Sequence, residues 1–180
     1  GFFWTCNISL PTAALRTVGG FDDKNFRQAI CEDVEIGFRL AYEGYKVLYI
    51  PEAKCEHEHY ISPAAYVRRA RKLGVNTAKM AGIHGWHLLN FKEWRTLGAQ
   101  YTLAEIEEMY WNKKHLYEHA LPHAQTIFVQ VERIERNGIA PGLKALNKLM
   151  DGIHLLNWVY YLEGVLAEFN ARYHFEQPQR

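Results

Sequence analysis

Two adjacent acids, Glu32 and Asp33, have the type and spacing best suited to chemistry in this chain. On a helix the second acid would share one face with the apolar or small residues Ile36, Gly37 and Leu40. That face should turn inward, where a carboxylate costs free energy unless it caps the helix, forms an ion pair or takes part in a reaction. The spacing alone leaves two interpretations of Asp33 open, as a helix N-cap or as a catalytic base.

A second group of potential ligands consists of Cys55, His57 and His59, which alternate along the chain. If the segment is extended, all three side chains point to the same side. A small zinc-binding domain, with Cys31 as a further ligand, is therefore one hypothesis, although the spacing lacks the usual loop between ligand pairs. The alternative is that the histidines are structural and bind no metal.

Short alternating elements are predicted to position these residues. The predicted strands cover residues 2–10 and 45–50, with a further short strand or extended loop over 54–59. The predicted helices between them cover residues 12–17 and 33–43. Gly19-Gly20 marks a turn after the first helix, and Gly44 suits the end of the second.

Residues after about 60 have a helical pattern throughout. Ser62 and Pro63 suit the N-cap and the first position of a basic helix that ends near 82–85. Thr102 with Glu105 predicts a capping box at the start of a later helix. The remaining predictions are a short aromatic helix or loop over 91–98 and helices over 122–136 and 141–173. The expected fold is an α/β segment over 1–60 followed by a mainly helical region over 61–180, α-rich overall.

Length, charge and cysteine content limit the class of protein. The 180 residues are enough for one domain with a core, or for a small domain with an appendage. The net charge of +1 gives no reason to expect a nucleic-acid partner. Three cysteines form no disulfide framework, so a reducing compartment is expected. No signal peptide or bilayer-length apolar run is visible, and the chain begins within a predicted strand, which indicates a fragment of a longer protein.

Taken in order, the motifs of the first 60 to 80 residues resemble the second half of the catalytic domain of family 2 glycosyltransferases, which have the GT-A fold. The matching motifs are Asn7-Ile8-Ser9, Gly19-Gly20-Phe21-Asp22, Glu32-Asp33, Arg39-Leu40, Gly44-Tyr45, Pro51-Glu52-Ala53 and His57/His59. Each motif alone is weak, but the ordered set at close spacing is specific. The resemblance implies a partial GT-A-like segment over 1–60 and a helical extension over 61–180.

The resemblance also implies an activity. Family 2 enzymes transfer a sugar from a nucleotide-sugar donor to a hydroxyl of a glycan or lipid-linked acceptor, with inversion at the anomeric carbon. Asp33 matches the general base that takes the proton of the acceptor hydroxyl. Glu32 would bind a hydroxyl of the donor or acceptor, or simply cap the helix.

Further residues match substrate or metal positions of that family, and each has a structural alternative. Asn7 would bind the donor or bridge two strands, and Gly19-Gly20 would admit a sugar close to the backbone or form a plain turn. Asp22 would contact the acceptor or cap a turn, with the turn favoured, while Phe21 is expected to pack in the core. His59, with His57 as second choice, would approach the diphosphate or complete a metal site.

The basic helix after Ser62 has two interpretations. Its charges form a solvated face or a seat for acidic partners, or they contact a diphosphate or an anionic membrane surface. Arg71 is the candidate to serve the diphosphate leaving group. Processive family members carry a Gln-x-x-Arg-Trp motif in this region. The segment 67–74 contains neither the glutamine nor the tryptophan, which argues against a processive polysaccharide synthase.

The sequence contains no Asp-x-Asp motif, so the nucleotide-binding half of such an enzyme is missing. A divalent cation, Mn2+ or Mg2+, is expected mainly through that missing half, and the 180 residues alone would be inactive. The resemblance implies a cytoplasmic location, with peripheral contact at the inner face of the membrane, and cell-envelope polysaccharide synthesis. The rival hypotheses are the zinc-binding domain and a non-catalytic helical module that binds a partner, a membrane surface or a second copy of itself.

Overall fold

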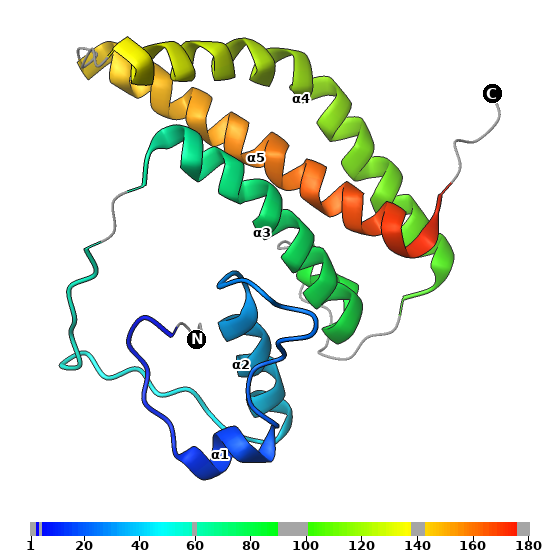
Figure 1. Cartoon of the computed structure of the whole chain (residues 1–180). Helices are drawn as coiled ribbons and strands as arrows, with labels where there is room; N and C mark the ends of the chain where they lie inside the picture. Colours follow the sequence, from blue (N-terminus) through cyan, green and yellow to red (C-terminus); the bar gives the residue numbers. More distant parts are fainter. Residues whose placement is uncertain (1–2, 4, 59–60, 90–100, 138–142, 176–180) are drawn as a thin grey trace. The chain divides into compact units, whose positions relative to one another are not determined.

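The computed structural model describes residues 3, 5–58, 61–89, 101–137 and 143–175. These residues form helices α1 (Thr12–Thr17), α2 (Glu32–Tyr42), α3 (Pro63–His84), α4 (Leu103–Asn137) and α5 (Leu143–Tyr173), and the 3-10 turn η1 (Trp86–Leu89) (Figure 1). The chain divides into two compact units, Gly1–Tyr60 and Ile61–Arg180.

The expected α/β, partial GT-A-like segment over 1–60 is wrong, since the described part of the chain contains helices and irregular segments but no strand. Residues 45–50 have the alternating pattern of a strand, yet they lack regular structure, and Leu48 and Tyr49 are 80% and 88% exposed. The amide of Tyr45 donates to the carbonyl oxygen of Leu40 at the end of α2. A strand requires a neighbouring strand to complete its hydrogen bonds, and the described residues do not pair in that way.

Helices α1 and α2 of the first unit confirm the local predictions. Helix α1 covers the predicted residues, and the chain then turns through Gly19 and Gly20, whose φ angles are 77° and 76°. Helix α2 ends before Gly44, which has φ 83° and so lies in the left-handed region that suits glycine. Turn and cap residues therefore fix the ends of these elements as the sequence indicates.

The core of the first unit is small. It contains Phe3, Ala14, Ile36 and Leu40. A Cβ atom placed on Gly37 would lie 2.5 Å from the Cβ of Phe3, so the absence of a side chain on Gly37 lets Phe3 pack directly against α2. This contact brings the first residues of the chain to the helix that carries Glu32 and Asp33.

Helices α3 and α5 of the second unit cross at very close range. Ser62 caps α3 as predicted, with its Oγ accepting a hydrogen bond of 3.3 Å from the amide of Ala65. A Cβ atom on Gly74 would lie 2.0 Å from the carbonyl oxygen of Tyr161, and one on Gly164 would lie 2.0 Å from that of Arg71. Glycine at both positions therefore permits the two backbones to approach.

Helix α4 is one element of 35 residues, whereas the sequence pattern predicts a separate helix over 122–136. Pro122 lies inside it, and Figure 1 shows that the helix bends along its length. Proline removes one amide donor and is a common cause of a bend. It need not end a helix that is packed against a neighbour both before and after the proline. The predicted capping box is confirmed, since Thr102 Oγ1 accepts from the amide of Glu105, and a Glu105 carboxylate oxygen accepts from the amide of Thr102.

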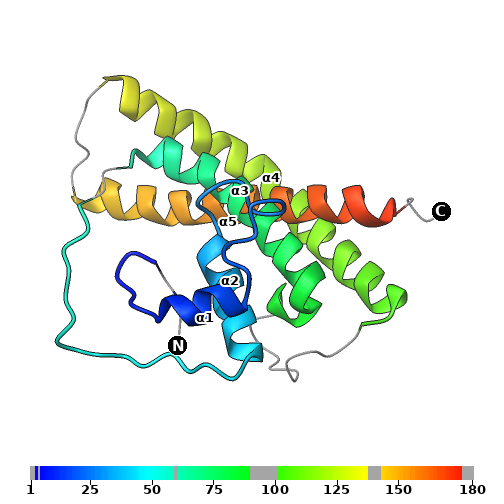
Figure 2. The ribbon, with the colours of Figure 1, turned by 60° about the horizontal axis from the view of Figure 1, so that its bottom comes forward.

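Helix α5 packs along both α3 and α4, which contact each other much less (Figures 1 and 2). Two hydrophobic clusters lie along α5. One contains Trp86 and Phe169, whose rings stack with centroids 4.7 Å apart. The other contains Val131 and Leu156. The second unit is thus a small helical bundle with its central helix buried on two sides.

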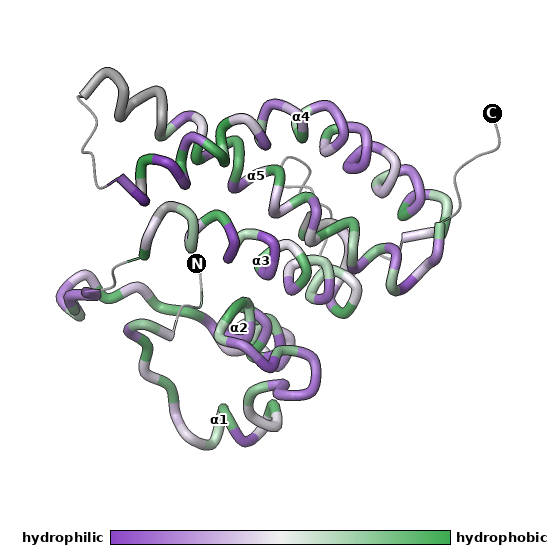
Figure 3. Tube along the Cα trace, turned by 45° about the horizontal axis from the view of Figure 1, so that its top comes forward, coloured by the Kyte–Doolittle hydropathy of each residue, from purple (hydrophilic) through white to green (hydrophobic). Residues whose placement is uncertain are grey.

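The long helices carry hydrophilic and hydrophobic residues in alternation along their length (Figure 3). In the part of the chain that the structure describes, no helix is both long enough and apolar enough to cross a membrane.

Candidate functional site

The acids Glu32 and Asp33 form the first turn of α2. The N-cap is Cys31, with φ 70°, so the interpretation of Asp33 as the N-cap is wrong. A left-handed conformation is rare for a residue other than glycine, because it costs free energy. Backbone strain of this kind is often found next to functional sites. Asp33 is 8% exposed and lies on the inward face with Ile36, as the helical spacing predicts.

The Asp33 carboxylate is oriented from two directions. Its Oδ1 accepts a hydrogen bond of 2.8 Å from the amide of Val34, and its Oδ2 lies 3.3 Å from the amide nitrogen and 3.5 Å from the Oγ1 of Thr5. Thr5 follows the segment that Phe3 anchors on α2. A carboxylate offers about four acceptor positions, so these donors leave capacity for a further hydroxyl.

Glu32 differs from its neighbour in its hydrogen bonding. Its Oε2 atom is buried and has no hydrogen-bond partner among the described residues. Buried polar atoms without a partner are uncommon because the lost solvation is not compensated, so each calls for an explanation. A donor from outside the described residues would complete its hydrogen bonding.

A buried ion pair on α2 fixes the helix to the end of α1. The guanidinium of Arg39 donates to both carboxylate oxygens of Glu35, with the shortest distance 2.7 Å, and Glu35 is 1% exposed. The same guanidinium donates to the carbonyl oxygen of Val18. Val18 precedes Gly19-Gly20, so this pair holds the glycine turn beside α2.

The turn residues have structural explanations. A Cβ atom on Gly19 or Gly20 would meet nothing within 4 Å, so the positive φ angles explain both glycines without a close approach. Asp22 accepts hydrogen bonds from the amides of Lys24 and Asn25 and from the Asn25 side chain at 2.7 Å. That side-chain bond is the main cause that lowers the pKa of Asp22 from its ordinary value of 3.8. Asp22 thus forms the turn that the sequence analysis favoured.

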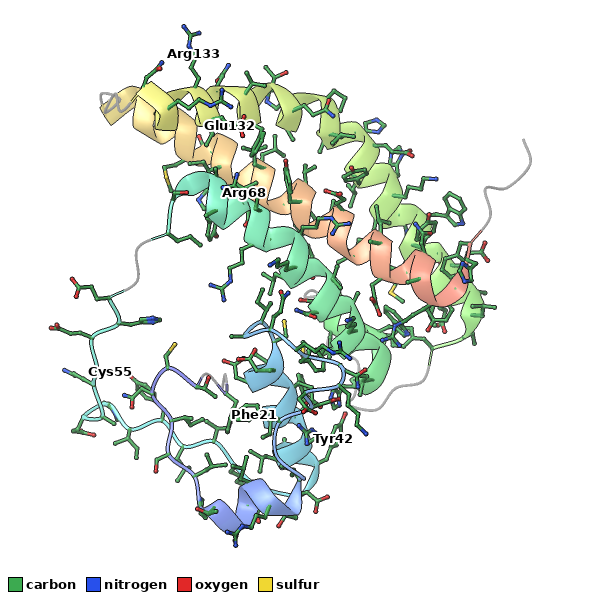
Figure 4. The ribbon with its side chains drawn as sticks, viewed as in Figure 1. Phe21, Tyr42, Cys55, Arg68, Glu132 and Arg133 are labelled. Atoms are coloured by element: carbon green, nitrogen blue, oxygen red, sulfur yellow. The ribbon has the colours of Figure 1, made fainter. Side chains whose placement is uncertain are left out.

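Phe21, between the glycine turn and Asp22, is 48% exposed (Figure 4). The expectation that it packs in the core is therefore wrong. An exposed aromatic ring is available for contact with a ligand or another chain.

The segments around Asn7 and His57 lie next to each other without forming strands. Asn7 Nδ2 donates to the carbonyl oxygen of Ala53 at 2.9 Å, and Cys6 Sγ lies 3.5 Å from His57 Nδ1. Cys55 is exposed, and its thiol lies 3.9 Å from the carbonyl oxygen of Cys6 (Figure 4). Asn7 therefore bridges two irregular segments, and not two strands as the sequence predicts.

The described residues around Cys55 and His57 do not assemble the predicted metal site. No group of three or more His, Cys, Asp or Glu side chains among them could hold a metal ion. The zinc hypothesis also required His59, which lies outside the described residues. His57 contacts a thiol, and this single histidine offers no cage for a hard divalent cation, which prefers several oxygen ligands.

Arg71 belongs to α3 in the second unit. Its Nε lies 3.0 Å from Glu163 Oε1 of α5, and both side chains are about half exposed. Arg68 of α3 and Glu132 of α4 lie at one end of this unit (Figure 4). Ion pairing across the helices thus accounts for part of the basic face that the sequence analysis left open.

The pKa of Tyr160 in α5 is affected by the same charged residues. Its pKa is raised above 10.0 by burial, with Glu163 and Glu132 acting in the same direction and Arg68 in the opposite one. The basic face of α3 is therefore partly balanced by acids of α4 and α5.

Sequence reasoning missed Thr5 and the Glu35–Arg39 pair. The spacing of Glu35 and Arg39 is that of a helical ion pair, so that contact could have been found. The contacts of Thr5 with Asp33, and of Arg39 with Val18, join distant parts of the chain and have no local signal.

Residues 1–136 match the sequence family described as glycosyl transferase family group 2. The match covers the whole first unit, α3 and nearly all of α4. It therefore includes the candidate site at the start of α2.

Two curated relatives are similar over a shorter stretch. Over 43 residues the chain is 49% identical to validoxylamine A glucosyltransferase of Streptomyces hygroscopicus subsp. jinggangensis (strain 5008), a stretch that is 24% of this chain and 10% of that protein. The protein of the same name from Streptomyces hygroscopicus subsp. limoneus is 49% identical over 43 residues, which cover 24% of this chain and 9% of the relative. The matched stretch thus spans about a tenth of these relatives. No solved structure matches the chain.

Proposed function

The chain belongs to glycosyl transferase family group 2, and from this premise we propose that its first unit forms the acceptor side of a transferase active site. The reaction moves a sugar from a nucleotide-sugar donor to a hydroxyl of a glycan or lipid-linked acceptor, with inversion at the anomeric carbon. A nucleotide-activated glucose is the first donor to test, because both relatives are named glucosyltransferases.

The observation that carries this proposal is the pair of unlike carboxylates at the N-terminus of α2. Asp33 is buried and held by donors from two segments, whereas Glu32 keeps a buried oxygen that no described residue satisfies. A base must be held within hydrogen-bond reach of the proton it removes. The oriented acid suits proton transfer, and the acid with an unmet acceptor suits binding of a neighbouring hydroxyl.

In the proposed step, the oxygen of the acceptor hydroxyl attacks the anomeric carbon of the donor. The bond from that carbon to the diphosphate oxygen breaks, and the diphosphate leaves with the electron pair. Asp33 accepts the proton of the attacking hydroxyl as the new bond forms. Glu32 accepts a hydrogen bond from a second hydroxyl of the acceptor and so orients it.

The groups that bind the nucleotide-sugar donor are expected in sequence outside these residues. The chain has no Asp-x-Asp motif for a divalent cation, Mn2+ or Mg2+, so no step here is derived through a metal. The remaining substrate and diphosphate contacts stay predictions, namely Asn7, Gly19, Gly20, His57, His59 and Arg71. The cytoplasmic location with peripheral membrane contact is likewise a prediction.

The test is the Asp33→Asn substitution in the complete polypeptide that contains this chain. Asparagine keeps the shape of the side chain but accepts no proton, so transfer from labelled nucleotide-glucose should fall about 10²- to 10⁴-fold. The donor Kd, measured by calorimetry, should stay within about twofold, because the base contacts the acceptor.

Two matched substitutions separate the base from its neighbours. Glu32→Gln should reduce transfer less than Asp33→Asn, since an amide oxygen still accepts a hydrogen bond. Asp22→Asn should leave transfer nearly unchanged, because Asp22 serves a turn. Normal turnover by the Asp33→Asn enzyme would refute the assignment of the base.

A further inference from the structure

Two histidines form a pair on the surface of α4, in the second unit and outside the candidate active site. His115 and His119 are one helical turn apart, and both are exposed. Their ring centroids lie 4.3 Å apart, with the ring planes inclined by 49°. Residues spaced by four along a helix share one face, so the two rings are presented together.

We propose that His115 and His119 form a two-histidine chelate for a borderline divalent transition-metal ion such as Ni2+, Cu2+ or Zn2+. Imidazole nitrogens suit these ions, whereas Mg2+ and Ca2+ prefer oxygen ligands. Water fills the remaining coordination positions, since the described residues contain no group of three potential ligands. The site is therefore accessible and exchangeable.

The observed geometry suits chelation. Zinc-binding helices in other proteins use two histidines at this same spacing on one face. Imidazole nitrogens bind such ions at about 2.0–2.1 Å, which requires the two donor atoms to approach to roughly 3 Å. Rings with centroids 4.3 Å apart meet that requirement through rotation about their side-chain bonds alone. Binding of the ion therefore requires little change in the conformation of the helix.

The position of the pair gives the ion a structural effect. Pro122 interrupts the hydrogen bonding of α4, because it has no amide to donate to the carbonyl oxygen of Glu118. His115 and His119 span the turn just before this interruption. An ion that joins them cross-links that turn and opposes local opening of the helix at the proline.

The test is a calorimetric titration of the full polypeptide with Ni2+ alone, in mildly alkaline buffer that contains no other chelator. His115→Gln and His119→Gln should each weaken the apparent Kd by at least about tenfold, because each removes one of two ligands. Glutamine favours helix and the side chains are exposed, so both variants should keep the thermal unfolding midpoint of the unaltered protein without metal.

His154→Gln on α5 is the neutral control, since it removes an exposed histidine from another helix. His123→Gln is the competing case, because His123 lies four residues after His119 on α4 and tests whether the ion uses that pair instead. Each should bind Ni2+ within about twofold of the unaltered protein. Hydrogen exchange gives a second measurement: Ni2+ should slow exchange of the amides at 115–121 in the unaltered protein and not in His119→Gln. The proposal is overturned if no Ni2+ binds, if all four variants bind alike, or if His123→Gln weakens binding while His115→Gln does not.

Discussion

The two units of this chain are held together in different ways. The first unit has short helices of 6 and 11 residues, one small apolar cluster and several hydrogen bonds between distant segments. The second unit has helices of 22, 35 and 31 residues and two larger clusters along α5. The residues proposed for chemistry therefore lie where polar contacts position the chain, and the extensive helical packing lies elsewhere.

Substitutions should therefore affect the stability of the two units differently. A small core leaves little stability to spare, so loss of one buried polar contact should disorder much of the first unit. In the second unit, many apolar contacts support each helix, and only a change that separates the backbones should have a comparable effect.

The largest effect on stability is expected from Arg39→Met in the first unit. It takes the Arg39 guanidinium away from the buried carboxylate of Glu35 and removes the link to Val18. Loss of one member of a buried pair typically costs 3–5 kcal/mol, and partial exposure of Arg39 reduces this to about 3 kcal/mol. Denaturant unfolding, with hydrogen exchange to localise the loss, measures it.

The double variant Glu35→Met with Arg39→Met is the control. It removes both charges, so it should recover part of the lost stability. Equal stability of the single variant and the unaltered protein would show that this pair does not hold the first unit.

Gly164→Ala tests the helix crossing of the second unit. The added Cβ would lie 2.0 Å from the carbonyl oxygen of Arg71, which is backbone and cannot move alone. We expect a loss of about 2–3 kcal/mol in the free energy of unfolding, because the helices must separate. Thermal and denaturant unfolding measure the loss.

Gly152→Ala is the matched change on the same helix. Its Cβ would lie 2.8 Å from a methyl carbon of Ile127, a side chain that can rotate. The gain in helix propensity, up to about 1 kcal/mol, should offset much of that contact. Similar losses for the two glycines would contradict the close crossing of α3 and α5.

The smallest effect concerns Asp22 and pH. Its pKa is lowered in the folded chain, chiefly by the side chain of Asn25. The stability it contributes is therefore present above the ordinary pKa of 3.8 and is lost as the pH falls through the lower folded value. Asp22→Asn should remove this acid-side dependence, with a change below about 0.5 kcal/mol because the group is partly exposed and solvent screens its interactions.

Acid titration of unfolding free energy, in the unaltered protein and in Asp22→Asn, measures this difference. A stability that rises as the pH falls through this range would contradict the assigned hydrogen bonds of the turn.

Local signals in the sequence predicted the local structure well. The cap at Ser62, the capping box at Thr102 and the end of α2 at Gly44 each depend on one or two neighbouring residues, and all are confirmed. The inward face of α2 followed from helical spacing, which also placed Asp33 correctly on that face.

Features that depend on distant residues could not be predicted in this way. The pattern over 45–50 indicates a strand only if another strand pairs with it, and the described residues do not supply one. Pro122 locally favours a helix boundary, but α4 packs against α5 both before and after this residue, and that packing overrides the preference. Likewise, nothing near Asp33 in the sequence indicates that Thr5 orients it.

Rescue of a base-deleted enzyme by formate tests the central claim, that Asp33 accepts the proton of the acceptor hydroxyl. Asp33→Ala in the complete polypeptide removes the carboxylate and leaves space beside Thr5. Transfer of labelled sugar should then fall about 10²-fold or more and recover in part as formate is added, because a small carboxylate can occupy that space and act as the base. Transfer by Asp33→Ala at the unaltered rate without formate would contradict the account.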